Sequence, residues 1–271
     1  MVTMTTTIPQ EIKRALDTGT QIEPFTVRMP QLSLADAYDA AQLVREMRTR
    51  EGARVVGRKI GFTNRNLWPI YDVHQPIWGY VYDQTLTRAP DARATCSLRG
   101  LADPRIEPEI VFGLRHGLRG AASIRDVLDA IEWVACGFEI VQSHFPDWKF
   151  KVADTVIDGG LHGKLIVGPA MPLSSLGTDP IAALESFTIE LSRDGNHVET
   201  GKGSNVLGSP LNAMQHLASV LADQGERAAL APGEIVTTGT LTLAYPIRPG
   251  ETWTYTVAGL PLPGFTLALV E

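Results

Sequence analysis

The chain has 271 residues, 44% of them hydrophobic and 20% charged, with a formal net charge of -6. Such a composition is typical of a globular protein large enough to bury a substantial core. The acidic balance, without a basic cluster, argues against nucleic-acid binding. The two cysteines, Cys96 and Cys136, lack CxxC spacing, which predicts neither a disulfide framework nor a zinc site.

The sequence also lacks the marks of export or membrane insertion. The start, Met1–Thr7, has no charged region followed by an apolar core, as a signal peptide would have. No stretch reaches the roughly 18 consecutive apolar residues that a membrane span needs. We therefore expect a cytoplasmic protein that binds neither membranes nor nucleic acids.

The first part of the chain is predicted to be helical over residues 8–50. Ser33 and Asp36 form a capping-box pattern at the start of its last helix. Residues 55–63 then predict a strand that enters a glycine-bounded turn and carries Lys59. Because Lys59 has apolar or glycine neighbours on both sides, a functional position and an ordinary surface position are both open.

Two glutamates share one face of the next predicted strand, residues 105–112. Side chains alternate along a strand, so Glu107 and Glu109 point the same way, while the apolar side chains point to the other face. Neighbouring carboxylates repel each other unless a cation lies between them. Pro108 cannot donate a ladder hydrogen bond, which indicates an edge, a bulge or a strand end. The alternative interpretation is a half-exposed strand with two solvated glutamates.

A third carboxylate favours the cation. Glu139 lies inside the apolar run 133–141, where an unpaired charge is rare. A helix predicted to start at Ser123 leads into this run, and the strand-helix-strand arrangement can return the third glutamate beside the first two. Oxygen ligands of this kind favour Mg2+ or Mn2+, with Lys59 and Lys151 as partners for an anionic substrate.

A second polar stretch, residues 151–163, places a lysine, a threonine, two aspartates and a histidine among small residues. Ligand binding and an ordinary loop both explain it. Farther on, residues 187–200 predict a β-hairpin around Asp194-Gly195-Asn196, and Ser209-Pro210 predicts a helix that runs to about Ala222. The end of the chain predicts strands at residues 234–245, 252–257 and 265–270.

Several of these segments follow one another in the order of a known protein family. They are Gly57–Thr63, the Glu107-Pro108-Glu109 pair, Glu139, Lys151–Thr155, Gly208–Ala213 and Gly239–Thr242. In this order, from about residue 30 onwards, the chain resembles the 2-oxopent-4-enoate hydratase and 4-oxalocrotonate decarboxylase family of the fumarylacetoacetate hydrolase superfamily. The resemblance implies an α+β fold, a mixed β-sandwich roll with a smaller helical N-terminal part, and a homo-oligomer. We expect an N-terminal helical and strand part at residues 1–100 and a catalytic domain at residues 101–271.

The same resemblance implies roles for individual residues. A divalent ion, Mg2+ or Mn2+, would be held by Glu107, Glu109 and Glu139. Lys59 matches an acid/base or carboxylate-binding lysine, and Asp158 and His162 are also predicted to be catalytic. The predicted substrate-binding residues are Lys151, Thr155 and Thr240, and the implied substrate is a small 2-oxo acid.

The implied reaction is the metal-dependent addition of water to a 2-hydroxy-2,4-dienoate in the catabolism of aromatic compounds. Two alternatives stay open: a vinylogous decarboxylase of the 4-oxalocrotonate type, and a non-catalytic partner subunit of a related enzyme. The stretch Asp158–His162 departs from the Asp-Asn and small residues of many relatives, which leaves the substrate open. C–C bond hydrolysis is the weaker interpretation, because residues 59–66 lack the His-Glu pair of the hydrolase branch.

Overall fold

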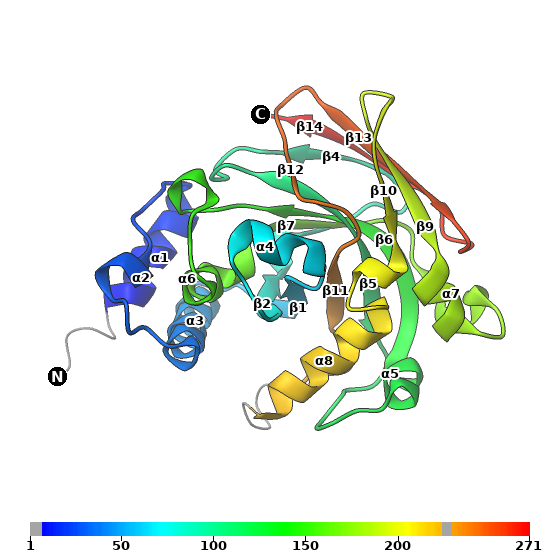
Figure 1. Cartoon of the computed structure of the whole chain (residues 1–271), viewed down its shortest axis with the longest axis horizontal. Helices are drawn as coiled ribbons and strands as arrows, with labels where there is room; N and C mark the ends of the chain where they lie inside the picture. Colours follow the sequence, from blue (N-terminus) through cyan, green and yellow to red (C-terminus); the bar gives the residue numbers. More distant parts are fainter. Residues whose placement is uncertain (1–6, 224–228) are drawn as a thin grey trace.

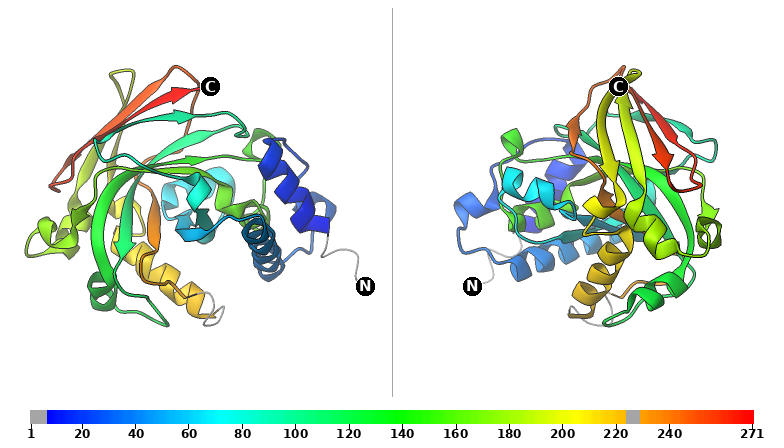
Figure 2. Two further views of the ribbon diagram at one scale, coloured as in Figure 1. Left: turned by 180° about the vertical axis from the view of Figure 1, so that it is seen from behind. Right: turned by 45° about the vertical axis from the view of Figure 1, so that its right-hand side comes forward.

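The computed structural model describes residues 7–223 and 229–271, which form a curled large sheet, a smaller sheet and surrounding helices (Figures 1 and 2). The large sheet runs in the order β2 (Ile77–Tyr82), β1 (Val55–Gly61), β11 (Ile235–Thr240), β5 (Arg105–Leu114), β6 (Ile131–Val141), β7 (His162–Val167) and β3 (Leu86–Arg88). Short strands β12 (Tyr245–Pro246) and β8 (Met171–Pro172) pair with β5 and β6. The small sheet runs in the order β10 (Asn196–Lys202), β9 (Thr188–Arg193), β13 (Thr252–Ala258), β14 (Phe265–Val270) and β4 (Arg93–Ser97).

The N-terminal helices lie at one end of the large sheet (Figure 1). They are α1 (Thr7–Thr18), α2 (Phe25–Arg28) and α3 (Leu34–Arg50), and they share an apolar core with α6 (Val152–Ile157). The predicted capping box is present, since the Asp36 backbone N–H donates to the Ser33 hydroxyl at 3.1 Å. The helical N-terminal part that the sequence predicts is therefore confirmed. A short helix, α4 (Trp68–Tyr71), follows β1.

The small sheet packs against the face of β5 and β6 that is opposite to the glutamates. Phe138 of β6 contacts Tyr255 edge-on and stacks on Phe265, with ring centroids 4.9 and 5.6 Å away. Helices α5 (Ile124–Ala130), α7 (Pro180–Ser186) and α8 (Pro210–Asp223) contribute to the same core. Helix α5 begins at the predicted Ser123 cap, and the β9–β10 hairpin and α8 also lie where the sequence predicts them.

The central strand pair brings the predicted glutamates together. Strand β5 lies between β11 and β6, and its register places Glu107 directly opposite Glu139. The chain returns through α5, as the strand-helix-strand pattern predicts. An edge at Pro108 is wrong, because β5 is an interior strand; the observed irregularity is a register shift in β11 next to it. The Pro108 carbonyl accepts from Leu241 N just beyond the end of β11, so the missing proline N–H falls where no ladder bond is needed.

Strands β1 and β2, which precede residue 100, pair within the same sheet as β11. The domain boundary near residue 100 stays a prediction. None of the helices in residues 7–223 and 229–271 combines the length and the apolar character that crossing a bilayer requires. Most of the segment considered for a signal peptide, residues 1–6, lies outside the described residues, and the cytoplasmic location stays a prediction.

Candidate active site

Three buried carboxylates form the centre of the candidate site. Glu107 and Glu109 project from β5 and Glu139 from β6, and one oxygen from each lies within 4.8 Å of the others. Directly paired residues of antiparallel strands point to the same face, so the register itself produces this cluster. Glu109 and Glu139 are fully buried, and Glu107 is 8% exposed.

The hydrogen bonds of this cluster are incomplete. One oxygen of Glu109 accepts from the Gly239 backbone N–H at 2.7 Å and from the Thr237 hydroxyl. The second oxygen of Glu109 (Oε1) is buried without a hydrogen-bond partner, and the buried Oε2 of Glu139 has only the Lys59 ammonium beside it, at 3.3 Å. Buried polar atoms normally have partners, and oxygens open toward a shared point suit a hard divalent cation.

Electrostatics lead to the same conclusion. Burial, together with the neighbouring charge of Glu139, raises the pKa of Glu107 to about 7. Burial and the charges of Glu139 and Glu107 raise the pKa of Glu109 well above its usual value. Burial would also raise the pKa of Glu139, but the charge of Lys59 and the hydrogen bond from His162 hold it below its usual value. The charge of Glu139 is thus compensated by Lys59 and His162. Glu107 and Glu109 lack enough neighbouring positive charge to stabilise their ionised forms.

Lys59 is the cation that the fold itself places at this cluster. Its side chain projects from β1, only 2% exposed, and Nζ lies 3.3 Å from Oε2 of Glu139. The same ammonium group donates to the Gly160 carbonyl at 2.9 Å. Burial alone would lower the pKa of Lys59, but the three glutamates raise it, so the lysine stays charged.

His162 lies behind Glu139, at the start of β7. Its Nδ1 is 2.8 Å from Oε1 of Glu139, and its Nε2 is 2.8 Å from the Thr85 hydroxyl. Both ring nitrogens are therefore engaged, and the ring orientation is fixed from two sides. A histidine held in this way controls the position of the carboxylate that it contacts.

A pocket opens beside the cluster. Lys59, Glu107 and Thr240 line its polar end, while Tyr71 and Trp148 line its aromatic end. Next to it, Arg105 donates to the Tyr71 hydroxyl at 2.8 Å, and its guanidinium lies 4.1 Å from the centre of the Trp148 ring. The pocket therefore combines charged groups with flat apolar walls, as small-molecule sites commonly do.

Comparison with known proteins places this geometry in a family. Residues 65–263 match the model described as "Fumarylacetoacetate (FAA) hydrolase C-terminal". The chain is 33% identical to a 2-hydroxyhexa-2,4-dienoate hydratase of Comamonas testosteroni, over 93% of this chain and 92% of that protein. It is 34% identical to a 4-oxalocrotonate decarboxylase of Pseudomonas sp, over 82% and 84% of the two chains. The chain belongs to the fumarylacetoacetate hydrolase family.

A solved structure of this family extends the likeness to the fold. The 4-oxalocrotonate decarboxylase from Pseudomonas putida G7, complexed with magnesium and adipate, superposes with a TM-score of 0.88. The two chains are 27% identical, and the match covers 98% of this chain and 97% of the other. The fumarylacetoacetate-hydrolase-like fold and the resemblance inferred from the sequence motifs are thus confirmed, and the protein is an enzyme of this superfamily.

The predicted substrate-binding residues of this family member divide into two groups. Thr240 lines the pocket beside the glutamates and pairs with Glu109 across the strands. Lys151 is exposed and lines a separate surface depression near Pro24 and Phe150. Thr155 is buried, and its hydroxyl donates to the Val152 carbonyl at 2.8 Å within its own helix. Of these three residues, only Thr240 lies beside the glutamate cluster.

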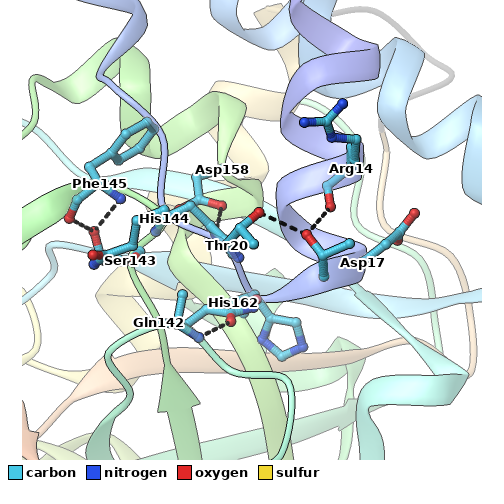
Figure 3. A network of polar contacts seen from close by, with 12 residues as sticks. Arg14, Asp17, Thr20, Gln142, Ser143, His144, Phe145, Asp158 and His162 are labelled. Atoms are coloured by element: carbon cyan, nitrogen blue, oxygen red, sulfur yellow. Dashed lines mark hydrogen bonds and ion pairs between the residues drawn. The ribbon is translucent and has the colours of Figure 1, made fainter.

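Asp158, predicted to be catalytic, lies outside the pocket lining. It is fully buried, and its two oxygens contact the Nδ1 and the backbone N–H of His144, at 2.7 and 3.2 Å (Figure 3). This pair anchors the segment that continues to Gly160, whose carbonyl holds Lys59. Asp158 thus supports the segment that holds Lys59, and its catalytic role stays a prediction.

Sequence reasoning missed four residues that shape the family site. Thr237 and Gly239 hold Glu109, Thr85 holds His162, and His144 holds Asp158. A signal existed only for the first two, since the run Thr237–Thr240 puts small polar residues in a strand that otherwise reads as core. Gly239 adopts φ +100°, and a Cβ there would lie 1.8 Å from the Thr63 hydroxyl oxygen.

Proposed function

We propose that this protein is a divalent-metal-dependent hydratase that adds water to a 2-hydroxy-2,4-dienoate and yields a 4-hydroxy-2-oxo acid in the catabolism of aromatic compounds. The observation that carries the proposal is a cluster of three buried glutamates, with an unpartnered oxygen on Glu109, beside a pocket that contains a charged lysine. Similarity to hydratases over most of the chain supports it. The substrate would be a small 2-oxo acid, and we expect a homo-oligomer.

The residues at the site fit a divalent ion. Glu107, Glu109 and Glu139 would hold Mg2+ or Mn2+, because three buried carboxylates with one oxygen each within 4.8 Å and too little positive charge are what such an ion satisfies. When bound, the ion would act as a Lewis acid toward the oxygens of a 2-oxo acid and stabilise negative charge on them. The related decarboxylase from Pseudomonas putida G7 is complexed with magnesium, which supports this choice of metal.

The chain's own groups supply the remaining functions. Lys59, charged and held by the Gly160 carbonyl, presents Nζ at the pocket wall, where it can bind a substrate carboxylate or transfer a proton. His162 orients Glu139 through Nδ1. Thr240 offers a hydroxyl in the same wall, although that hydroxyl also donates to the Thr242 carbonyl at 3.0 Å. Tyr71 and Trp148 limit the length of the substrate and shield its conjugated part from water.

A 4-oxalocrotonate-type decarboxylase is the second candidate. The decarboxylase structure superposes over almost the whole chain, and the decarboxylase sequences are as similar as the hydratase sequences. Both reactions require negative charge to be stabilised on a 2-oxo acid, so the glutamates alone do not distinguish them. A non-catalytic partner subunit, the third interpretation, predicts no turnover of either substrate and stable co-purification with a related enzyme.

One experiment separates these functions. The purified protein is incubated with Mg2+ and either a 2-hydroxy-2,4-dienoate or 4-oxalocrotonate, while ultraviolet absorbance and CO2 release are followed together. Loss of dienoate absorbance without CO2 supports the hydratase. Release of CO2 from oxalocrotonate, without hydration of the dienoate, assigns the decarboxylase instead. Light scattering of the same sample tests the expected homo-oligomer.

A further inference from the structure

A second pocket lies behind strand β2, on the side away from Lys59. The register pairs Lys59 with Gly79, so the alternating side chains of Trp78, Tyr80 and Tyr82 project to the opposite face of the sheet. Together with α3 and the segment around Gly159, they line a cavity of about 140 Å³. An apolar cavity of about this size is large enough to hold a benzene ring.

The two pockets are separated by a thin wall of backbone. A Cβ atom built on Gly79 would lie 2.1 Å from the Gly159 carbonyl oxygen, so the two segments touch without intervening side chains. Gly160, on the other side, accepts the hydrogen bond of Lys59. His162 lines the second pocket and at the same time contacts Glu139 at 2.8 Å. The second pocket is therefore adjacent to the metal cluster but is not continuous with the pocket that contains Lys59.

The lining of this second pocket combines aromatic rings with one permanent positive charge. Tyr38 and Trp78 stack with ring centroids 5.2 Å apart. Arg48 is the permanently charged side chain among the described lining residues, and none of them is acidic. Its contact with Asp17 is long, 3.9 Å, because the other oxygen of Asp17 already binds Lys13 at 2.6 Å. The Arg48 guanidinium therefore keeps donors for another anion.

We propose that this cavity is a binding site for a small aromatic monocarboxylate, with the ring among the aromatic side chains and the carboxylate at Arg48. The aromatic walls provide flat apolar contacts, and a guanidinium forms charge-assisted hydrogen bonds with a carboxylate. This inference does not rest on the proposed hydratase activity. It concerns a separate site, with its own charged group.

The test uses benzoate as the probe and the full-length protein with Mg2+ and saturating oxalate, which occupies the metal centre. Isothermal titration calorimetry should show one benzoate per chain with a dissociation constant in the submillimolar range. Benzyl alcohol, which keeps the ring and lacks the charge, should bind about tenfold more weakly. The absence of benzoate binding up to millimolar concentration, or its loss when oxalate is added, would overturn the proposal.

Three variants locate the site. Arg48→Gln should weaken benzoate binding about tenfold, as expected for the loss of a charged hydrogen bond. Arg50→Gln is the matched control, because Arg50 lies on the same helix with a side chain 75% exposed and does not line the cavity. Ala41→Phe should fill the cavity and abolish binding. Circular dichroism checks that Ala41→Phe is folded. Whatever that result, wild-type benzoate affinity in Arg48→Gln would overturn the proposal.

Discussion

The molecule buries two groups of carboxylates under opposite conditions. Asp154 accepts hydrogen bonds from the Thr26 hydroxyl at 2.6 Å, the Thr26 N–H at 3.0 Å and the Lys151 N–H at 2.9 Å. Asp158 has a donor on each oxygen, both from His144. In the glutamate cluster, by contrast, Oε1 of Glu109 has no partner, and Oε2 of Glu139 has only the Lys59 ammonium, 3.3 Å away.

Burial alone therefore does not mark a functional carboxylate in this protein. The aspartates and the glutamates are equally inaccessible, and only the completeness of their hydrogen bonds differs. A satisfied carboxylate has no remaining capacity for a ligand, whereas an open oxygen next to a second and a third carboxylate requires a cation. We infer that the aspartates hold the fold and that the glutamates bind the metal.

The largest expected effect is on metal binding by Glu109. Glu109→Gln keeps an acceptor for the Gly239 N–H but removes the charge, so Mg2+ affinity should fall by more than about 100-fold. Thermal stability without metal should not fall, because the raised pKa of Glu109 reflects an unfavourable buried charge. Calorimetry and melting curves measure both. Glu132→Gln, exposed on the same sheet, is the control, and unchanged metal affinity in Glu109→Gln would contradict the assignment.

The next effect concerns turnover. Lys59→Ala should lower kcat by about 10², as expected for the loss of a general acid or base. Mg2+ affinity should change by less than about tenfold, because the metal itself compensates the charge of Glu139 once Lys59 is absent. Steady-state kinetics and metal titration separate the two. A variant with normal kcat would remove Lys59 from the reaction.

Substitution of an aspartate whose hydrogen bonds are complete should lower the free energy of unfolding and leave Mg2+ affinity unchanged. Asp154→Asn places an amide nitrogen against donors from Thr26 or Lys151, which should cost about 2 kcal/mol of unfolding free energy. Below the unfolding transition, kcat and Mg2+ affinity should stay at wild-type values. Urea unfolding measures the loss, with the exposed Asp147→Asn as control. Reduced metal affinity at unchanged stability would contradict the distinction between the two groups.

His162 combines features of both groups, since both of its ring nitrogens have partners and one of them is Glu139, a proposed metal ligand. His162→Asn should weaken Mg2+ binding about tenfold, because Glu139 loses the group that orients it. Thr85→Val should act in the same direction but less strongly, since it removes only the second support of the ring. Metal titration of both variants tests the order. Wild-type affinity in both would leave His162 without a positioning role.

The smallest effect concerns an exposed, satisfied carboxylate. The Ser33 hydroxyl and N–H lower the pKa of Asp36 below its usual 3.8. The folded state therefore gains stability from ionised Asp36 above the usual pKa, and this gain disappears as the pH falls through the lower, folded-state value. Asp36→Asn should lower Tm slightly at pH 7, and the difference from wild type should vanish in strong acid. A difference that persists there would show that the charge is not its cause.

The sequence predicted most of the fold because local signals agreed with the tertiary packing. The caps at Ser33 and Ser123 set two helix starts, and the hairpin around Asp194-Gly195-Asn196 set one strand pair. The alternation of residues 105–112 predicted which face carries the glutamates. The position of Pro108 in the sheet was harder to predict. An interior strand tolerates a proline here because of the register shift in β11, and no local sequence pattern encodes that register.

The site was predictable where charge and topology combine. Glu139 was identified because a charge inside an apolar run needs a partner, and Lys59 because its neighbours are apolar. Asp158 could not be distinguished from a catalytic group, since its partner His144 is recognisable only once the chain is folded. For the same reason, the sequence could not show that Lys151 faces away from the cluster.

The three glutamates come from a single hairpin-like unit, β5, α5 and β6, whereas most of the walls of the adjoining pocket come from segments before and after it. The proposed ion ligands and most of the pocket walls are thus encoded in separate stretches of chain. Substitutions in the walls can alter which acid is accepted while the ligand geometry stays intact. This separation gives a structural reason why relatives with different reactions can share one architecture.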